Sequence, residues 1–201
     1  MKYLKVLIFA VVASLLLAIS STASATVLCK NNSNTTTCSE PYAIGTEIEA
    51  KGVTNVVIDT EFKTVECKIT SGTGEITNAG SSTSAVVITD IASVYEKCNC
   101  SVVVLQFGEL TLTYIEGTDN ATSIWNNEEL TVSCSTLFGN VHCIYRTENT
   151  DTGKLIGGTP ATVNTSGAVP RKPTNSLCSG EANVTDTSEI SSPQPLYVSA
   201  G

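Results

Sequence analysis

The stretch SVVVLQFGELTLTYIE, residues 101–116, is typical of β-structure. Its first half is a continuous apolar run, and its second half alternates, with Leu110 and Leu112 on one face and threonines on the other. β-Branched and aromatic residues favour strands, and a period of two indicates a strand with one buried face. We therefore expect a central strand covered on both faces, then a half-buried strand, joined as a hairpin by a tight turn at Gly108.

Runs of similar composition recur along the chain, separated by Gly, Asn, Asp or Pro. The further strands expected are residues 55–60, 65–70, 84–91, 129–134, 141–147, 161–166, 181–187 and 195–200. No long segment after the first 25 residues has the 3.6-residue apolar period of a helix. The sequence thus predicts an all-β fold, a two-sheet antiparallel β-sandwich with Greek-key or jelly-roll-like connections. A β-barrel is the alternative.

The first 25 residues have the pattern of an export signal. Lys2 and Lys5 precede an apolar run over residues 6–19, and small residues lead up to Ala25, after which we expect cleavage. The apolar run is short for a membrane span, and no later stretch is long and apolar enough to be one. We therefore expect a cleaved signal peptide over residues 1–25 and a single domain over residues 26–201 that is secreted or held in the cell envelope.

The charge of the chain limits its partners. The sequence has 11 Lys and Arg against 19 Asp and Glu, and removal of the signal would take two of the lysines away. Nucleic acid and anionic lipid are excluded as main partners, because nothing would offset their phosphate charge. A cell-surface polymer or a protein is the expected partner, and the oligomeric state stays open.

The cysteines predict a disulfide framework. All eight follow the signal: Cys29, Cys38, Cys67, Cys98, Cys100, Cys134, Cys143 and Cys178. An even count in an exported chain favours disulfides, and the chain lacks the C-x-x-C pairs typical of zinc or redox sites. The first two most simply close the polar loop between them. Cys98 and Cys100 project from one face of a strand and cannot easily bond each other, so we expect one to pair with Cys67 and the other with Cys178.

The stretch TVSCSTLFGNVHCIYRT, residues 131–147, places the only histidine of the chain between two cysteines. With residues 137–140 as the loop of a hairpin, Cys134 lies directly opposite Cys143, close enough for a disulfide. His142 then points to the other face, beside serines, and cannot share a metal with the cysteines. No nucleophile motif accompanies it, so neither a catalytic nor a metal role is expected.

Two more features bear on binding. Trp125 lies between Asn-rich turns, where its indole either contacts a ligand or packs into the protein. Glu128 and Glu129 are adjacent, so a strand sends them to opposite faces, which is the wrong arrangement for the paired acids of a glycosidase. We expect both to lie at a solvated edge.

Several motifs together suggest a resemblance: ATVLCKNNSNTTTC, FKTVEC, FGNVHCIYRTENTDTG and the closing LYVSA. They resemble those of a group of exported, cysteine-containing all-β bacterial proteins, from actinobacteria especially, to which no activity is assigned. The resemblance implies export, an all-β fold and local cysteine pairs, with an acidic glycine turn at residues 150–153. Cys100 departs from the group's pattern, which leaves the third and fourth bridges open.

The sequence thus favours a non-catalytic module, either adhesive and structural or ligand-binding, rather than an enzyme. It predicts no cofactor, no metal and no catalytic residue, and Trp125 is the one candidate ligand contact. A secreted hydrolase is a second hypothesis, and an extracellular inhibitor or effector that acts on a protein is a third.

Overall fold

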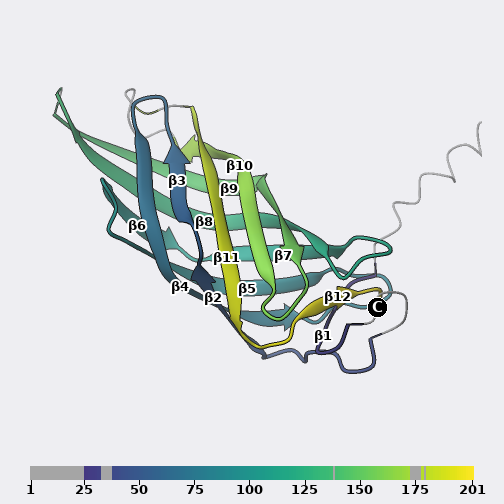
Figure 1. Cartoon of the computed structure of the whole chain (residues 1–201). Coiled ribbons are helices and arrows are strands. Elements are labelled where there is room, and N and C mark those ends of the chain that lie inside the picture. The colour runs from purple at the N-terminus through teal and green to yellow at the C-terminus, as the bar shows by residue number, and fades with distance from the viewer. Residues whose placement is uncertain (1–24, 33–37, 138, 173–177, 179) are drawn as a thin grey trace, which may run out of the picture.

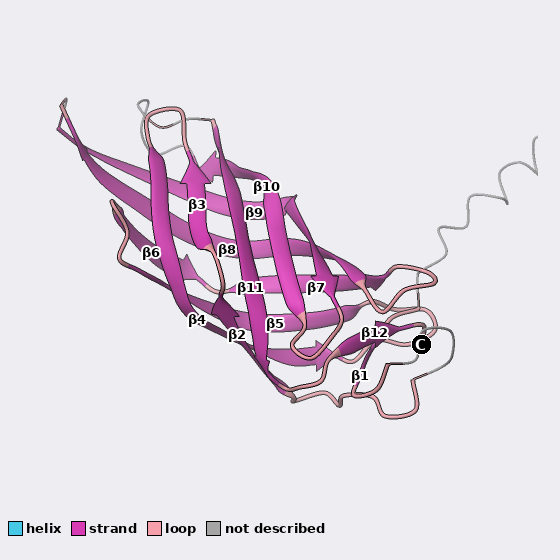
Figure 2. Ribbon diagram, in the orientation of Figure 1, coloured by secondary structure: helices cyan, strands magenta, loops and turns pink. Residues whose placement is uncertain are grey.

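The computed structural model describes residues 25–32, 38–137, 139–172, 178 and 180–201. The expected signal peptide, apart from Ala25, lies outside these residues. Within them the secondary structure is all strand, with no helix and hence none that would cross a membrane (Figure 2). The strands are β1 (Val27–Cys29), β2 (Glu47–Gly52), β3 (Asn55–Asp59), β4 (Thr64–Asn78), β5 (Val86–Glu96), β6 (Ser101–Gln106), β7 (Gly108–Tyr114), β8 (Ala121–Thr136), β9 (Gly139–Ile156), β10 (Thr162–Lys172), β11 (Glu181–Ser192) and β12 (Tyr197–Ser199).

The strands form two antiparallel sheets, which confirms the predicted fold class. The small sheet pairs β1 with β12, and the remaining ten strands form one sheet in the order β10-β9-β8-β7-β5-β4-β2-β11-β3, with β6 paired to β8. Because β10 also pairs with β11, this sheet curls until its backbone pairing forms a closed circuit. Strands β3, β11 and β10 run in front of the others in Figure 1. One curled sheet thus supplies both layers around the interior.

The connections are simpler than the Greek-key or jelly-roll crossovers expected. From β7 to β11 each strand pairs with the next in the chain, and β11 then returns to β2 and β3. Such sequential antiparallel neighbours need only short turns, which fits the short Gly- and Asn-containing segments between the strands.

The interior holds two apolar clusters. The first lies beside the small sheet and includes Leu28, Leu112 and Leu155. The second includes Val132 and Tyr145 together with five disulfide-bonded cysteines. In β7 the residues buried in the first cluster alternate with partly exposed threonines, as the sequence predicts.

The predicted hairpin at Gly108 is wrong. Strands β6 and β7 do not pair with each other but follow one another along β8, with β7 also bonded to β5. Gly108 is buried, and a Cβ there would lie 3.0 Å from the Cβ of Glu128. The glycine therefore allows the close approach of β8 and does not form a turn. The expectation that β6 is covered on both faces is also wrong, because Val103 and Leu105 are exposed.

The predicted bond between Cys134 and Cys143 is wrong as well. Thr136 pairs with Gly139, so the hairpin loop contains only residues 137 and 138, two fewer than predicted. Gly139 has a φ of +106°, which favours glycine and lets the chain turn back this early. Cys134 consequently faces Val141, and the two cysteines are offset along the shared face.

All eight cysteines are nevertheless in disulfides. Cys29 pairs with Cys38, and Cys67 with Cys98, both in line with expectation. Cys100 bonds Cys134 rather than Cys178, which leaves Cys178 for Cys143; the Cα atoms of these two pairs are 4.9 and 5.7 Å apart. Each of the last three bridges joins a strand residue of the second apolar cluster to a cysteine outside the strands, 31 to 35 positions away in the chain.

Candidate ligand-binding cavity

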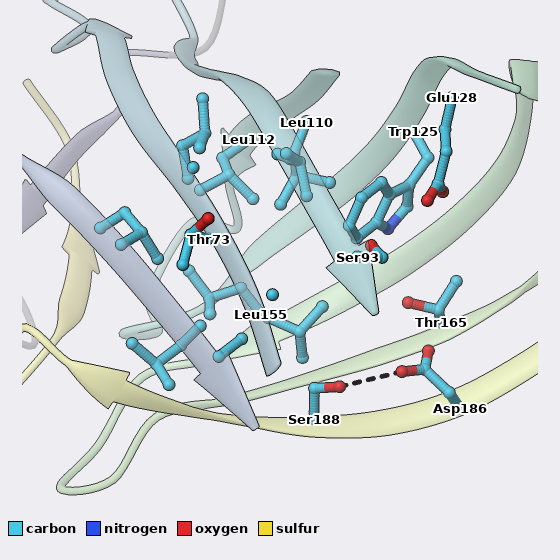
Figure 3. Close-up of a pocket in the computed structure, with 18 of the residues that line it drawn as sticks. Thr73, Ser93, Leu110, Leu112, Trp125, Glu128, Leu155, Thr165, Asp186 and Ser188 are labelled. Atoms are coloured by element: carbon cyan, nitrogen blue, oxygen red, sulfur yellow. Dashed lines mark hydrogen bonds between the residues drawn. The ribbon is translucent and has the colours of Figure 1, made fainter. Parts of the chain in front are cut away.

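A cavity of about 100 Å³ lies inside the curled sheet, next to the first apolar cluster. Its wall on one side is aliphatic, with Leu110, Leu112 and Leu155 among the lining residues (Figure 3). Its opposite side is polar. The polar and aromatic residues there are Ser93, Tyr95, Trp125, Glu128, Asp151, Thr165, Asp186 and Ser188. The cavity therefore has two chemically distinct ends.

An irregularity in β8 brings Trp125 and Glu128 to the same cavity. Residues at odd positions face inward up to Trp125, and residues at even positions face inward from Glu128 onward. The register with β9 shifts between these two residues, and Asn127 has a φ of +62°. A β-bulge of this kind adds a residue and reverses the alternation, so two side chains three positions apart point the same way.

A similar change occurs in β5. Ile88 faces the interior, the register shifts at Asp90, whose φ is +54°, and Ile91 and Ser93 then line the cavity. Tyr95 follows on the same face. The bulge thus places a serine and a tyrosine opposite the polar part of β8.

Regular cross-strand pairing supplies the remaining acids. Asp151 of β9 lies directly opposite Trp125, and Asp186 of β11 lies directly opposite Thr165 of β10. The Ser188 hydroxyl donates a hydrogen bond to Asp186, with an oxygen–oxygen distance of 2.9 Å. Figure 3 shows Glu128 and Asp186 on opposite sides of the polar end. We call Glu128, Asp151 and Asp186 the acidic cluster.

Burial makes ionisation of the acidic cluster costly. It raises the pKa of Glu128 from 4.5 to about 7, an effect that hydrogen bonding from Ser93 opposes and the charge of Asp186 increases. The pKa of Asp151 rises from 3.8 to about 7, mainly through burial and then through the charges of Glu128 and Asp186. Burial also raises the pKa of Asp186, against hydrogen bonds from Ser188 and Thr165. Near neutral pH Glu128 and Asp151 are therefore poised between their protonated and ionised forms.

Burial also raises the pKa of Tyr95. Removal from water, followed by the charge of Glu128, raises the pKa of its phenol well above 10.0. The phenol therefore remains protonated and can donate a hydrogen bond within the cavity.

Several polar atoms at this end have no hydrogen-bond partner. They include Oε1 of Glu128, Oδ1 of Asp151 and the indole Nε1 of Trp125. Glu128 and Asp151 are only 7% and 4% exposed. Buried polar groups are nearly always paired in native proteins, so unpaired ones that line a cavity indicate a missing partner. Among the described residues that line the cavity there is no Lys, Arg or His to act as that partner.

Sequence reasoning identifies part of this site. Trp125 lines the cavity, so its candidacy as a ligand contact stays open. Glu128 and Glu129 do differ in environment, but the expectation of a solvated edge is wrong for Glu128, which is buried. The expected turn at residues 150–153, which contains Asp151, lies within β9 instead. No sequence pattern singles out Asp186.

His142 lies away from the cavity, on the face opposite the cysteines, as predicted. It is exposed, and its Nδ1 is 2.8 Å from the hydroxyl of Ser133 in the neighbouring strand. In the part of the chain that the structure describes, no group of three or more His, Cys, Asp or Glu is arranged to hold a metal ion.

The fold and this cavity together define an all-β protein that is crosslinked by disulfides and has an interior cavity with one apolar and one polar side. Comparison with protein-family models, with curated protein sequences and with solved structures finds no match to the chain.

Proposed function

We propose that this protein is a non-catalytic binding protein, exported from the cell, that holds a small and mainly apolar molecule inside its curled sheet. The observation that carries this proposal is the cavity of about 100 Å³ with an aliphatic wall and a polar end. Concave sites with apolar walls and a few convergent polar groups are typical of small-molecule binding. Four disulfides support export, because such bonds persist mainly in oxidising compartments.

The size of the cavity limits the ligand. A buried water needs about 10–15 Å³ of such space, and a cavity of about 150 Å³ accommodates benzene. The space here is about two-thirds of the benzene-binding cavity and therefore suits a short chain or small ring of about four to six heavy atoms. A purely structural or adhesive module would gain nothing from keeping this space and its unpaired polar atoms in its interior.

A hydrolase and an extracellular inhibitor have less support than a binding protein. A hydrolase could use the near-neutral carboxyls as acid and base, but the only histidine, His142, is exposed on the outer face and does not line the cavity with them. An inhibitor or effector would act through its outer surface and would not explain the interior polar end.

Tryptophan fluorescence tests the proposal directly. Trp125 is the only tryptophan of the chain and lines the cavity, so a ligand there should change its emission. The purified mature protein would be titrated with 1-butanol, a neutral probe of suitable size, and the affinity checked by calorimetry. Saturable binding with a Kd of about 1 mM or below is expected.

Two alanine variants show whether the probe occupies the interior. Ala50 lines the cavity, whereas Ala92 lies on the opposite face of β5 from Ile91 and Ser93. Ala50→Leu should fill the space and weaken binding about ten-fold or more, and Ala92→Leu should leave it unchanged. Absence of saturable binding, or equal binding by Ala50→Leu, would contradict an interior site.

A further inference from the structure

We infer that the ligand is an organic cation, with a primary ammonium group held by the acidic cluster and an apolar body of a few carbons against the aliphatic wall. This inference rests on the proposed function, because it names the chemical class of the molecule in the same cavity.

The charge of the cavity is the first argument. Three carboxyl groups approach from β8, β9 and β11, and the remaining titratable group facing them is Tyr95 of β5, which is neutral. The remaining polar lining residues on these strands and on β10 are serines and threonines, with no basic side chain among the described residues of the lining. The empty cavity thus has an excess of acidic groups without a counter-charge, which favours a cationic ligand and disfavours an anionic one.

The pattern of unpaired atoms is the second argument. Oε1 of Glu128 and Oδ1 of Asp151 are hydrogen-bond acceptors, buried and without donors. An ammonium group has three donors and no acceptor, so it would satisfy both atoms and retain a donor for Asp186. The indole N–H of Trp125 is itself a donor. It needs an acceptor such as a water or a ligand hydroxyl.

The position of the aliphatic wall is the third argument. Figure 3 shows Leu110, Leu112 and Leu155 on the side of the cavity away from Glu128 and Asp186. A ligand with its ammonium group at the acidic cluster would place a hydrocarbon body along these leucines. A bare inorganic cation would leave this apolar space empty, and the described side chains do not form a metal-holding group.

Three probes with the same four-carbon chain test the inference on the intact mature protein: butylamine, 1-butanol and butanoate. Near pH 7.5 we expect butylamine to bind about ten-fold or more tightly than butanol, because charged hydrogen bonds are stronger than neutral ones. Butanoate should bind most weakly. If butanol binds as well as butylamine, or butanoate binds best, the amine inference is wrong although an interior binding site remains. If none of the three binds, the proposed function itself fails.

The pH dependence and two variants give an independent check. Between about pH 5.5 and pH 8 the affinity for butylamine should rise as the acidic cluster ionises, while that for butanol stays flat. Glu128→Gln should narrow the ratio of the two Kd values to within about three-fold. Glu129→Gln, whose side chain points to the opposite face, should keep the wild-type ratio. A pH-independent affinity for butylamine, or an unchanged ratio in Glu128→Gln, would count against the ammonium site.

Discussion

Replacing Glu128 with glutamine is expected to stabilise the empty protein above neutral pH. Glu128 is 7% exposed, and its Oε1 has no hydrogen-bond donor. Ionisation therefore puts a negative charge into a poorly solvated site that already contains Asp151 and Asp186. Glutamine has nearly the same size and shape but cannot ionise, so the variant avoids this cost.

The size of this stabilisation follows from the pKa of Glu128. Burial raises the pKa of Glu128 from 4.5 to about 7. Between these values the folded state holds a proton that the unfolded state has lost, so the free energy of unfolding falls as the pH rises through this window. Above pH 7 both states are ionised and the loss is complete. A shift of this size corresponds to about 3 kcal/mol, at 1.36 kcal/mol for each pKa unit.

Urea denaturation of the oxidised protein, followed by far-ultraviolet circular dichroism, measures this effect. Circular dichroism is preferable to fluorescence because Trp125 lies beside the substituted residue. Near pH 4.5, where the acid is neutral in the folded state and half-protonated in the unfolded state, the variant and the wild type should agree within about 1 kcal/mol. Near pH 8 the variant should be more stable by about 3 kcal/mol.

The control is Glu129→Gln, which changes the adjacent carboxyl on the opposite face. It should show no comparable gain in stability between pH 4.5 and pH 8. If Glu128→Gln is less stable than the wild type near pH 8, a donor or cation must stabilise ionised Glu128 in the empty protein. The acidic cluster would then have a counter-charge of its own and no need of a cationic ligand.

Three further predictions concern two glycines, the histidine and the disulfides of the surrounding strands and loops. Gly153→Ala should cost about 2 kcal/mol or more in urea denaturation, because the new Cβ would clash with the carbonyl oxygen of Asn164. Gly180→Ala should be tolerated, because no atom of the described residues lies within 4 Å of the position of its Cβ. His142→Ala should lower the free energy of unfolding by less than about 1 kcal/mol, because it removes only an exposed bond to Ser133. A larger loss in that assay would point to an unseen role for the imidazole. Mass spectrometry of unreduced digests should find two specific crosslinks and no direct bond across the β8–β9 hairpin: Cys100–Cys134 and Cys143–Cys178.

Properties that depend on local alternation are predictable from the sequence. In β7 the buried leucines alternate with threonines as expected, and His142 points away from the cysteines. Both follow from the period of two, which holds within any regular strand. The all-β class follows from the same pattern repeated along the chain.

Properties that depend on loop length or closure are not predictable in this way. The predicted hairpin register rests on a four-residue loop, and the two-residue loop shifts Cys134 from Cys143 to Val141. Gly139 is a usable signal, because a glycine directly after two loop residues favours an early return of the chain. Gly108 shows the converse: a glycine inside a strand pattern also occurs where a neighbour approaches closely.

The acidic cluster is harder to foresee for two reasons. The bulge near Asn127 reverses the alternation, so a simple strand pattern cannot place Trp125 and Glu128 on one face. Asp151 and Asp186 come from β9 and β11, on either side of β10, and only the register of these three strands brings them to the same cavity. Sequence patterns within one strand carry no information on that register.

The disulfides and the acidic cluster affect stability in opposite directions. Three bridges close loops of 31, 34 and 35 residues around the second apolar cluster. Each is expected to stabilise the fold by about 3 to 4 kcal/mol through restriction of the unfolded chain. This is comparable with the cost of about 3 kcal/mol for ionising one buried acid near pH 8. The crosslinked cluster can therefore offset the cost of the acidic cavity beside it. A protein that keeps an empty acidic cavity needs stability from elsewhere, and the cysteine-rich cluster supplies it.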